Sequence, residues 1–284
     1  MMFSEDYVAN HISQFELLTR SSNEVYRFTH NQQSYILKKS WMSPDNLSPF
    51  WYGLHRVFGF DFDIQRKHLS SVLQRLRNPH INVAELICTS DASRWQIFRE
   101  ADGVKYEPDE FPDSAEIERQ LGLYIGYLHS IEYDCYGVYP DPNRKGCFRQ
   151  DMSGCMQHIM ETHWKNDECV WDCFNTILHC DIAPQSYSLI MPDISANQFV
   201  YSHDLGRINA VVDVDAYVVG PREWELCILE MCLNNRRPFA DGYEQYQNLP
   251  DLSQCRSFYR FFSYLCNPWE KVDLQKFMTD HCIL

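Results

Sequence analysis

Residues 189–225 read LIMPDISANQFVYSHDLGRINAVVDVDAYVVGPREWE and contain two short apolar runs on either side of a polar turn. The runs cover residues 198–201 and 208–212, and the turn at 202–207 includes an Asp-Leu-Gly sequence. Apolar runs that flank a turn with Asp and Gly are typical of a β-hairpin. A hairpin is rigid, so we expect it to hold the side chains at its ends at fixed separations.

Carboxylates flank this predicted hairpin on both sides. Asp193 precedes the first run, and Asp213 and Asp215 follow the second. Carboxylates at fixed separation can hold a divalent cation and supply a proton-accepting base. Ordinary turn and cap chemistry is the alternative for each Asp taken alone. The ordered set of three favours a functional site.

The same stretch resembles the catalytic core of the aminoglycoside phosphotransferase and choline kinase-like family. These proteins are small-molecule kinases with a protein-kinase-like fold. The family carries a His-x-Asp, then a metal-binding Asn five residues after the Asp, then a hairpin that ends in a second metal-binding Asp. Met191, Pro192, Asp193, Gln198 and Asp213 match this pattern without a gap.

The resemblance implies a role for each matched residue. Asp193 would accept the proton of the substrate hydroxyl, and Asp213 and Gln198 would hold Mg²⁺ between the phosphates of ATP or GTP. Met191 replaces the family's His, and Gln198 replaces its Asn, although the amide oxygen of Gln can still ligate magnesium. A shift of one residue would place Asn197 at the amide position, but it would break the match to the strand that follows.

Strand patterns precede this core near the N-terminus. Residues 25–29 alternate in polarity, and residues 35–37 resume the pattern after a turn. These segments resemble the first strands of the family. Lys38 ends the later strand and matches the kinase lysine that binds nucleotide phosphates. A solvated lysine at a strand end is the alternative.

The resemblance also implies where the nucleotide lies. The turn before residue 25 would cover the phosphates, and the backbone that links the two lobes would hydrogen-bond the adenine. The family often has glycine in that turn, whereas this chain offers serine hydroxyls and backbone N–H groups to the phosphate. The residues concerned are Ser21, Ser22, Asn23, Phe98 and Ala101.

A helix is expected at residues 64–78, where apolar side chains recur on one face. In the family, the helix at this place carries a glutamate that pairs with the lysine, and no glutamate occurs here. Asp61 and Asp63 lie just before the helix and are candidate replacements. The missing glutamate, Met191 and Gln198 support a rival hypothesis. The rival is a catalytically weak or inactive relative that binds a nucleotide or a partner as a regulatory module.

Beyond residue 103 the chain reads as mainly helical, with apolar stripes at 117–131 and 151–180. We therefore expect an α+β, two-lobed, protein-kinase-like fold. Residues 1–100 would form an N-lobe with a sheet and one helix, and residues 101–284 would form the helical C-lobe with the acceptor pocket. The resemblance implies transfer of the nucleotide γ-phosphoryl group to a small-molecule acceptor.

The amino-acid composition bears on which classes of partner the chain can bind. The chain has 284 residues, 45% of them hydrophobic, and a formal net charge of −14. Nucleic acids and anionic membranes need basic patches, so the acidity disfavours both as partners. It slightly favours a cationic acceptor, although simple solubility is the plainer explanation. Candidate walls for a cation pocket are Glu230, Asp241 and Glu244, although a solvated acidic face is the plainer explanation for each alone.

The chain contains twelve cysteines, and its first residues show neither a basic leader nor an apolar segment. We therefore expect a cytoplasmic protein with reduced thiols. A third hypothesis is a structural metal site, because Cys169 and Cys173 lie near several histidines. Their spacing matches no zinc signature, which favours buried thiols on helices. The histidines are His158, His163 and His179.

Overall fold

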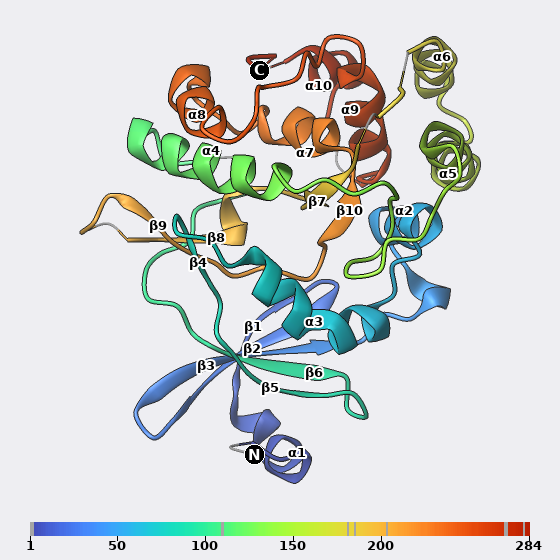
Figure 1. Ribbon diagram of the computed structural model, residues 1–284. Coiled ribbons are helices and arrows are strands. Elements are labelled where there is room, and N and C mark those ends of the chain that lie inside the picture. Colours follow the sequence, from blue (N-terminus) through green and yellow to red (C-terminus); the bar gives the residue numbers. More distant parts are fainter. Residues whose placement is uncertain are drawn as a thin grey trace.

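The structure is a computed structural model that describes residues 3–108, 111–180, 182–184, 186–202, 204–269, 272–280 and 282–284. A lobe built on a β-sheet lies at one end of the molecule and a helical lobe at the other, as Figure 1 shows. The two-lobed α+β architecture expected from the sequence is therefore confirmed.

The N-lobe sheet has five antiparallel strands in the order β1-β2-β3-β6-β5. Its register places Lys38 of the central strand opposite Val25 on one side and Gln96 on the other. The polar side chains that matter for function therefore come from three neighbouring strands. The strands are β1 (Glu16–Arg20), β2 (Asn23–His30), β3 (Gln33–Ser40), β5 (Leu86–Ser90) and β6 (Trp95–Arg99).

Helices lie against the N-lobe sheet. Helix α1 (Glu5–His11) and the 3₁₀ turn η1 (Ile12–Gln14) lie at the N-terminal end of the molecule, and α3 (Phe62–Leu76) lies toward the C-lobe (Figure 1). Helix α3 begins two residues earlier than expected, because the Asp61 side chain accepts hydrogen bonds from two backbone N–H groups of its first turn.

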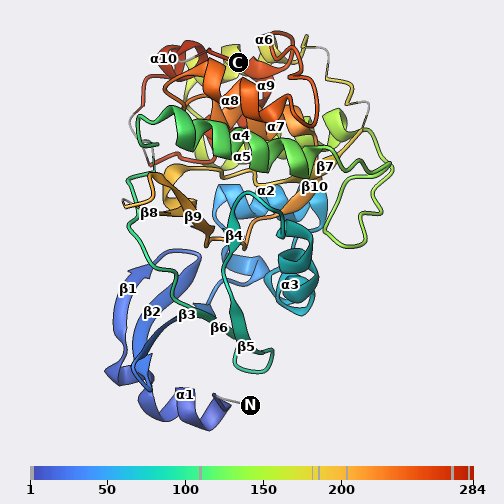
Figure 2. The ribbon, with the colours of Figure 1, turned by 60° about the vertical axis from the view of Figure 1, so that its left-hand side comes forward.

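The insert at residues 41–60 contains a helix that the sequence did not predict. It holds the 3₁₀ turn η2 (Pro44–Asn46) and helix α2 (Pro49–Phe58), which lies beside the C-lobe in Figures 1 and 2. A Cβ atom added to Gly53 would lie 2.4 Å from the Phe262 ring, and Phe58 stacks on Trp224 at 5.7 Å. The insert therefore packs against the C-lobe and joins it to the N-lobe.

Seven helices are described in the C-lobe part of the chain. The segment 151–180 forms two helices, because Asp167 caps a new helix after a break. Helices α4 and α8 approach each other at glycines, and a Cβ atom on Gly122 would lie 2.1 Å from the backbone oxygen of Phe239. The helices are α4 (Ala115–His129), α5 (Phe148–His163), α6 (Glu168–Ile177), α7 (Arg222–Leu229), α8 (Arg236–Tyr243), α9 (Arg256–Leu265) and α10 (Leu274–Thr279).

Short strands form the C-lobe surface that faces the N-lobe. The predicted hairpin is present as the antiparallel pair β8 and β9, and β4 from the N-terminal part adds a parallel strand beside β9. The predicted turn includes His203, which lies outside the described residues. Strands β7 and β10 form a second antiparallel pair. The bounds are β4 (Asn82–Val83), β7 (Ser188–Ile190), β8 (Phe199–Ser202), β9 (Arg207–Val211), β10 (Val218–Gly220) and the 3₁₀ turn η3 (Ala196–Gln198).

None of the described helices has both the length and the apolar character needed to cross a membrane.

Candidate active site

Lys38 of β3 lies at the junction of the two lobes and is 7% exposed. Its Nζ atom donates hydrogen bonds to Oδ1 of Asp213 at 2.7 Å and to Oδ2 of Asp215 at 3.1 Å. Burial disfavours the charged ammonium, but the two carboxylates outweigh burial and raise the pKa of Lys38 above its ordinary value. The structure thus brings together the predicted phosphate-binding lysine and the predicted metal-binding Asp213.

The predicted base, Asp193, lies in the loop between β7 and η3. The Nε2 atom of Gln198 lies 3.4 Å from Oδ2 of Asp193, and the backbone oxygen of Gln198 accepts hydrogen bonds from the backbone N–H groups of Val212 and Asp213. Gln198 therefore contacts the loop of Asp193 through its side chain and the backbone of Asp213 through its carbonyl. Asn197, the alternative amide, instead accepts a hydrogen bond from Ser195.

Two oxygen atoms in this loop are buried without a hydrogen-bond partner among the described residues. They are Oδ1 of Asp193 and Oε1 of Gln198. Burial, followed by the nearby charge of Asp213, raises the pKa of Asp193 to about 7. Buried oxygens without donors are suited to a ligand that supplies positive charge or a proton.

The donor set fits magnesium better than a transition metal. No three His, Cys, Asp or Glu side chains gather as a metal site in the described part of the chain, and this includes Cys169, Cys173 and the histidines near them in the sequence. Magnesium is commonly held by one or two carboxylates together with substrate phosphates and water. Asp213, whose pKa Lys38 lowers against the effect of burial, and the Gln198 amide oxygen meet that requirement.

The predicted phosphate turn lies between β1 and β2. The backbone N–H of Ser21 donates to the oxygen of Asn23, and the Trp41 indole N–H donates to the oxygen of Ser21 at 2.7 Å. The Asn23 side chain, at the end of this turn, is not free, because its amide nitrogen donates a hydrogen bond to Asp215 at 2.9 Å. Ser22 lies between them at the tip of the turn.

The predicted adenine-binding segment follows β6. Phe98 pairs within the sheet on both sides, with Ile36 and with Leu86, whereas Ala101 lies beyond the end of the strand. Gly103 then adopts a positive φ of 136°, and a Cβ atom there would lie 2.4 Å from the backbone oxygen of Tyr201. Close contact with β8 thus fixes the link between the lobes.

Lys105 is a site residue that the sequence reasoning missed. It follows the bridge between Val104 and Tyr201 and lies near both Asp213 and Lys38. The residue as a whole is exposed, but partial desolvation lowers the pKa of Lys105, while Asp213 opposes that effect. Nothing in the local sequence marks this lysine, because its place depends on the pairing of the link with β8.

The two predicted replacements for the helix glutamate do not contact Lys38. Asp61 caps α3, and Asp63 forms ion pairs with Arg66 and Arg94. Glu230, a predicted wall of a cation pocket, is also committed elsewhere, because it is fully buried and pairs with two arginines of α9. These expectations were wrong, since all three carboxylates have local partners.

Helix α7 contacts the start of the loop of Asp193 through the Glu225 side chain. The Glu225 carboxylate accepts a hydrogen bond from the backbone N–H of Met191 at 2.8 Å and lies 2.5 Å from Nε2 of His129. His129 in turn contacts the Tyr243 hydroxyl at 3.0 Å. All these groups are buried, so they fix the start of the loop, and His129 has a structural place in this network.

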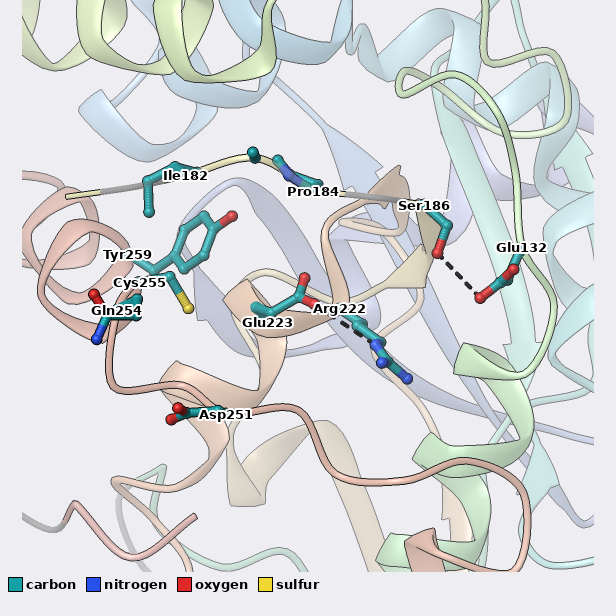
Figure 3. A pocket seen from close by; sticks show the side chains of 11 residues that line it. Glu132, Ile182, Pro184, Ser186, Arg222, Glu223, Asp251, Gln254, Cys255 and Tyr259 are labelled. Atoms are coloured by element: carbon teal, nitrogen blue, oxygen red, sulfur yellow. Dashed lines mark hydrogen bonds and ion pairs between the residues drawn. The ribbon is translucent and has the colours of Figure 1, made fainter.

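A cavity of about 340 Å³ lies beside the N-terminal end of α7 (Figure 3). The charged groups in its described lining are the carboxylates of Glu132, Glu223 and Asp251 and the guanidinium of Arg222. The cavity lies at the start of β7, whereas Asp193 follows the end of that strand. Strand β7 has three residues, so at about 3.3 Å per residue it separates these two places by roughly 10 Å.

Comparisons with known proteins were made by sequence and by structure. No protein-family model matches the sequence, and no curated protein matches it. Solved structures, in contrast, match over nearly the whole chain. The aminoglycoside phosphotransferase APH(2'')-Ib in its ADP-bound form matches with a TM-score of 0.60 at 14% identity and 97% coverage of both chains.

Two further matches are to enzymes of related chemistry. The macrolide 2'-phosphotransferase MphH from Brachybacterium faecium matches with a TM-score of 0.59 at 11% identity, over 95% of this chain and 99% of that one. An amicoumacin kinase in complex with AMP-PNP and Ca²⁺ matches with a TM-score of 0.57 at 16% identity, over 98% and 93% of the two chains. The chain therefore has the fold of the protein-kinase-like small-molecule phosphotransferases, as the resemblance in its sequence implied.

Proposed function

We propose that the protein is a small-molecule kinase that transfers the γ-phosphoryl group of ATP to a hydroxyl group. The observation that supports this most is the convergence of Lys38, Asp213, Gln198 and Asp193 where the two lobes meet. The two buried oxygens of that loop, which have no partner among the described residues, give a second argument, because a bound cation or a proton from the acceptor would satisfy them.

Each residue has a distinct task in this reaction. Lys38 binds and orients the phosphates, and Asp213 with Gln198 would hold magnesium, which would neutralise charge on the phosphates. Asp193 accepts the proton of the acceptor hydroxyl while the hydroxyl oxygen forms a bond to the γ-phosphorus. The bond between that phosphorus and the bridging oxygen breaks, and ADP leaves with the electron pair.

We propose a cationic, hydroxyl-bearing acceptor. The support is the cavity at the start of α7, whose described lining has three carboxylates against one guanidinium. A molecule with a hydroxyl group at Asp193 and an amine roughly 10 Å away would be needed to reach both places. Replacement of Glu223 or Asp251 by its amide should raise the KM for such an acceptor and leave the KM for ATP unchanged. Equal KM values for all variants would exclude the cavity.

The first experiment tests nucleotide binding by thermal unfolding with and without ATP and magnesium. A ligand that binds the folded state alone raises the unfolding midpoint by mass action. The wild type should show a magnesium-dependent rise that Asp213→Asn loses, and GTP serves as the comparison nucleotide. Asp193→Asn should keep the rise but lose phosphoryl transfer, since it acts on the acceptor. The absence of any rise with ATP or GTP would support the inactive-relative hypothesis instead.

A further inference from the structure

Helix α3 carries no carboxylate that reaches Lys38, so the lysine needs another partner. Protein kinases hold this lysine with a glutamate of the corresponding helix. Here the α3 residue that faces the site is Gln65, which is 4% exposed. Its Nε2 atom lies 3.5 Å from the backbone oxygen of Val214, between the two aspartates that bind Lys38, and its Oε1 atom has no partner among the described residues.

Asp215 provides Lys38 with the carboxylate partner that α3 lacks. Its Oδ2 atom accepts hydrogen bonds from Lys38 at 3.1 Å and from Asn23 at 2.9 Å, and its Oδ1 atom accepts one from Gln96 at 2.9 Å. The three donors come from the adjacent strands β3, β2 and β6. Asn23 is itself oriented by Ser40, whose hydroxyl donates to the Asn23 oxygen at 2.7 Å.

The two aspartates on Lys38 differ in exposure. The Asp213 side chain is 41% exposed, whereas that of Asp215 is 11% exposed. Asp213 is therefore accessible enough to turn from Lys38 to a ligand. Asp215 accepts hydrogen bonds from three side chains, and a change of partner would leave the Asn23 and Gln96 amides unpaired in a buried place.

We propose that Asp215 is the positioning residue of Lys38 and takes over the task of the absent helix glutamate. Asp215 acts through Lys38, and Asn23 and Gln96 hold Asp215 in place. When Asp213 engages the metal and the nucleotide, Asp215 keeps the ammonium of Lys38 directed at the phosphates. This inference rests on the proposed function, since it assumes that Lys38 binds nucleotide phosphate.

The test measures the dissociation constant of ATP with magnesium for four variants of the full chain. Asp215→Asn, which is isosteric, should weaken binding about tenfold, the usual effect of losing one charged hydrogen bond. In a Lys38→Met background the same change should have almost no further effect, because a residue that acts through Lys38 is silent without it. Asp215→Asn combined with Gln65→Glu returns a carboxylate from α3 and should recover most of the affinity.

Each outcome separates the inference from the proposed function. If the wild type does not bind ATP, both are refuted. If the wild type binds ATP and Asp215→Asn binds equally well, or if Asp215→Asn costs as much in the Lys38→Met background, the inference alone is refuted. A merely structural Asp215 would lower the unfolding midpoint without this dependence on Lys38 and Gln65.

A second variant covers the case in which Asp215→Asn does not fold. Gln96→Leu removes one donor to Asp215 and keeps both charges of the ion pair. It should weaken ATP binding by about threefold, less than the loss of a direct charged partner of Lys38, because Asn23 still holds Asp215. Unchanged affinity in a folded Gln96→Leu protein would then overturn the inference.

Discussion

The raised pKa of Asp193 should make the metal-free protein less stable as the pH rises. The pKa of this carboxyl is about 7 in the folded chain, because burial and then the charge of Asp213 oppose ionisation, against 3.8 for the unperturbed group. Between these two values the folded chain keeps a proton that the unfolded chain has released. Stability is therefore fully present below about pH 4 and is lost as the pH rises toward 7.

The size of this effect follows from the shift itself. Each unit of pKa difference corresponds to about 1.4 kcal/mol, so a shift of roughly three units gives on the order of 4 kcal/mol. The Asp193 side chain is not fully enclosed, and solvent relaxation reduces the measured value to about 2–4 kcal/mol. Asp193→Asn removes the titration and keeps the shape of the side chain.

The assay is urea unfolding in EDTA, followed by tryptophan fluorescence from about pH 4.5 to 8. Other groups titrate over the same range, so the informative quantity is the difference in the free energy of unfolding between wild type and Asp193→Asn. As the pH rises, the free energy of unfolding of the wild type should fall relative to that of Asp193→Asn, and the difference should level off above pH 7. Parallel curves for the two proteins would refute the reasoning, because Asp193 would then titrate alike in both states.

Two further changes test how the C-lobe supports the site. Glu225→Ala should lower the free energy of unfolding by about 3 kcal/mol, because it leaves Nε2 of buried His129 and the Met191 N–H unpaired, and Glu225→Gln, which keeps an acceptor for that N–H, should cost less. Equal unfolding curves for both variants in urea would contradict this account. Gly122→Ala should destabilise by about 1–3 kcal/mol, because its methyl group meets the α8 backbone. Gly154→Ala is the matched control: no atom lies within 4 Å of its added Cβ, so it should stabilise α5 by about 0.5–1 kcal/mol, and equal thermal midpoints for the two variants would contradict the close-approach argument.

The N-lobe strands and α4 follow from the sequence because their periodicity is local. Helix α2 was missed, although its ends carry recognisable signals. Pro49 is its first residue, and Gly59 follows it with a φ of 77°, which is a common C-terminal cap. The aromatic residues between them obscure the helical period, because both faces of α2 include large rings. One face of α2 packs on the C-lobe, and no local sequence pattern predicts this packing.

Only those site residues that belong to an ordered sequence pattern could be predicted from the sequence. Lys38, Asp193, Gln198 and Asp213 come from an ordered pattern, and the structure places them at one junction. The partners of Asp215 could not be read in this way. Asn23 and Asp215 are 192 positions apart, and their hydrogen bond depends on how the lobes meet.

Met191 shows why a departure from the family pattern need not disturb the loop of Asp193. Its side chain is 1% exposed and packs in the core, while its backbone N–H makes the bond to Glu225 that fixes the loop. A backbone group does not depend on which side chain is present, so Met can stand here and the loop still positions Asp193. The same logic applies at Ser21, whose backbone oxygen is held by the indole of Trp41. In both places the main chain does the positioning, so the substituted side chains are weak evidence for an inactive site.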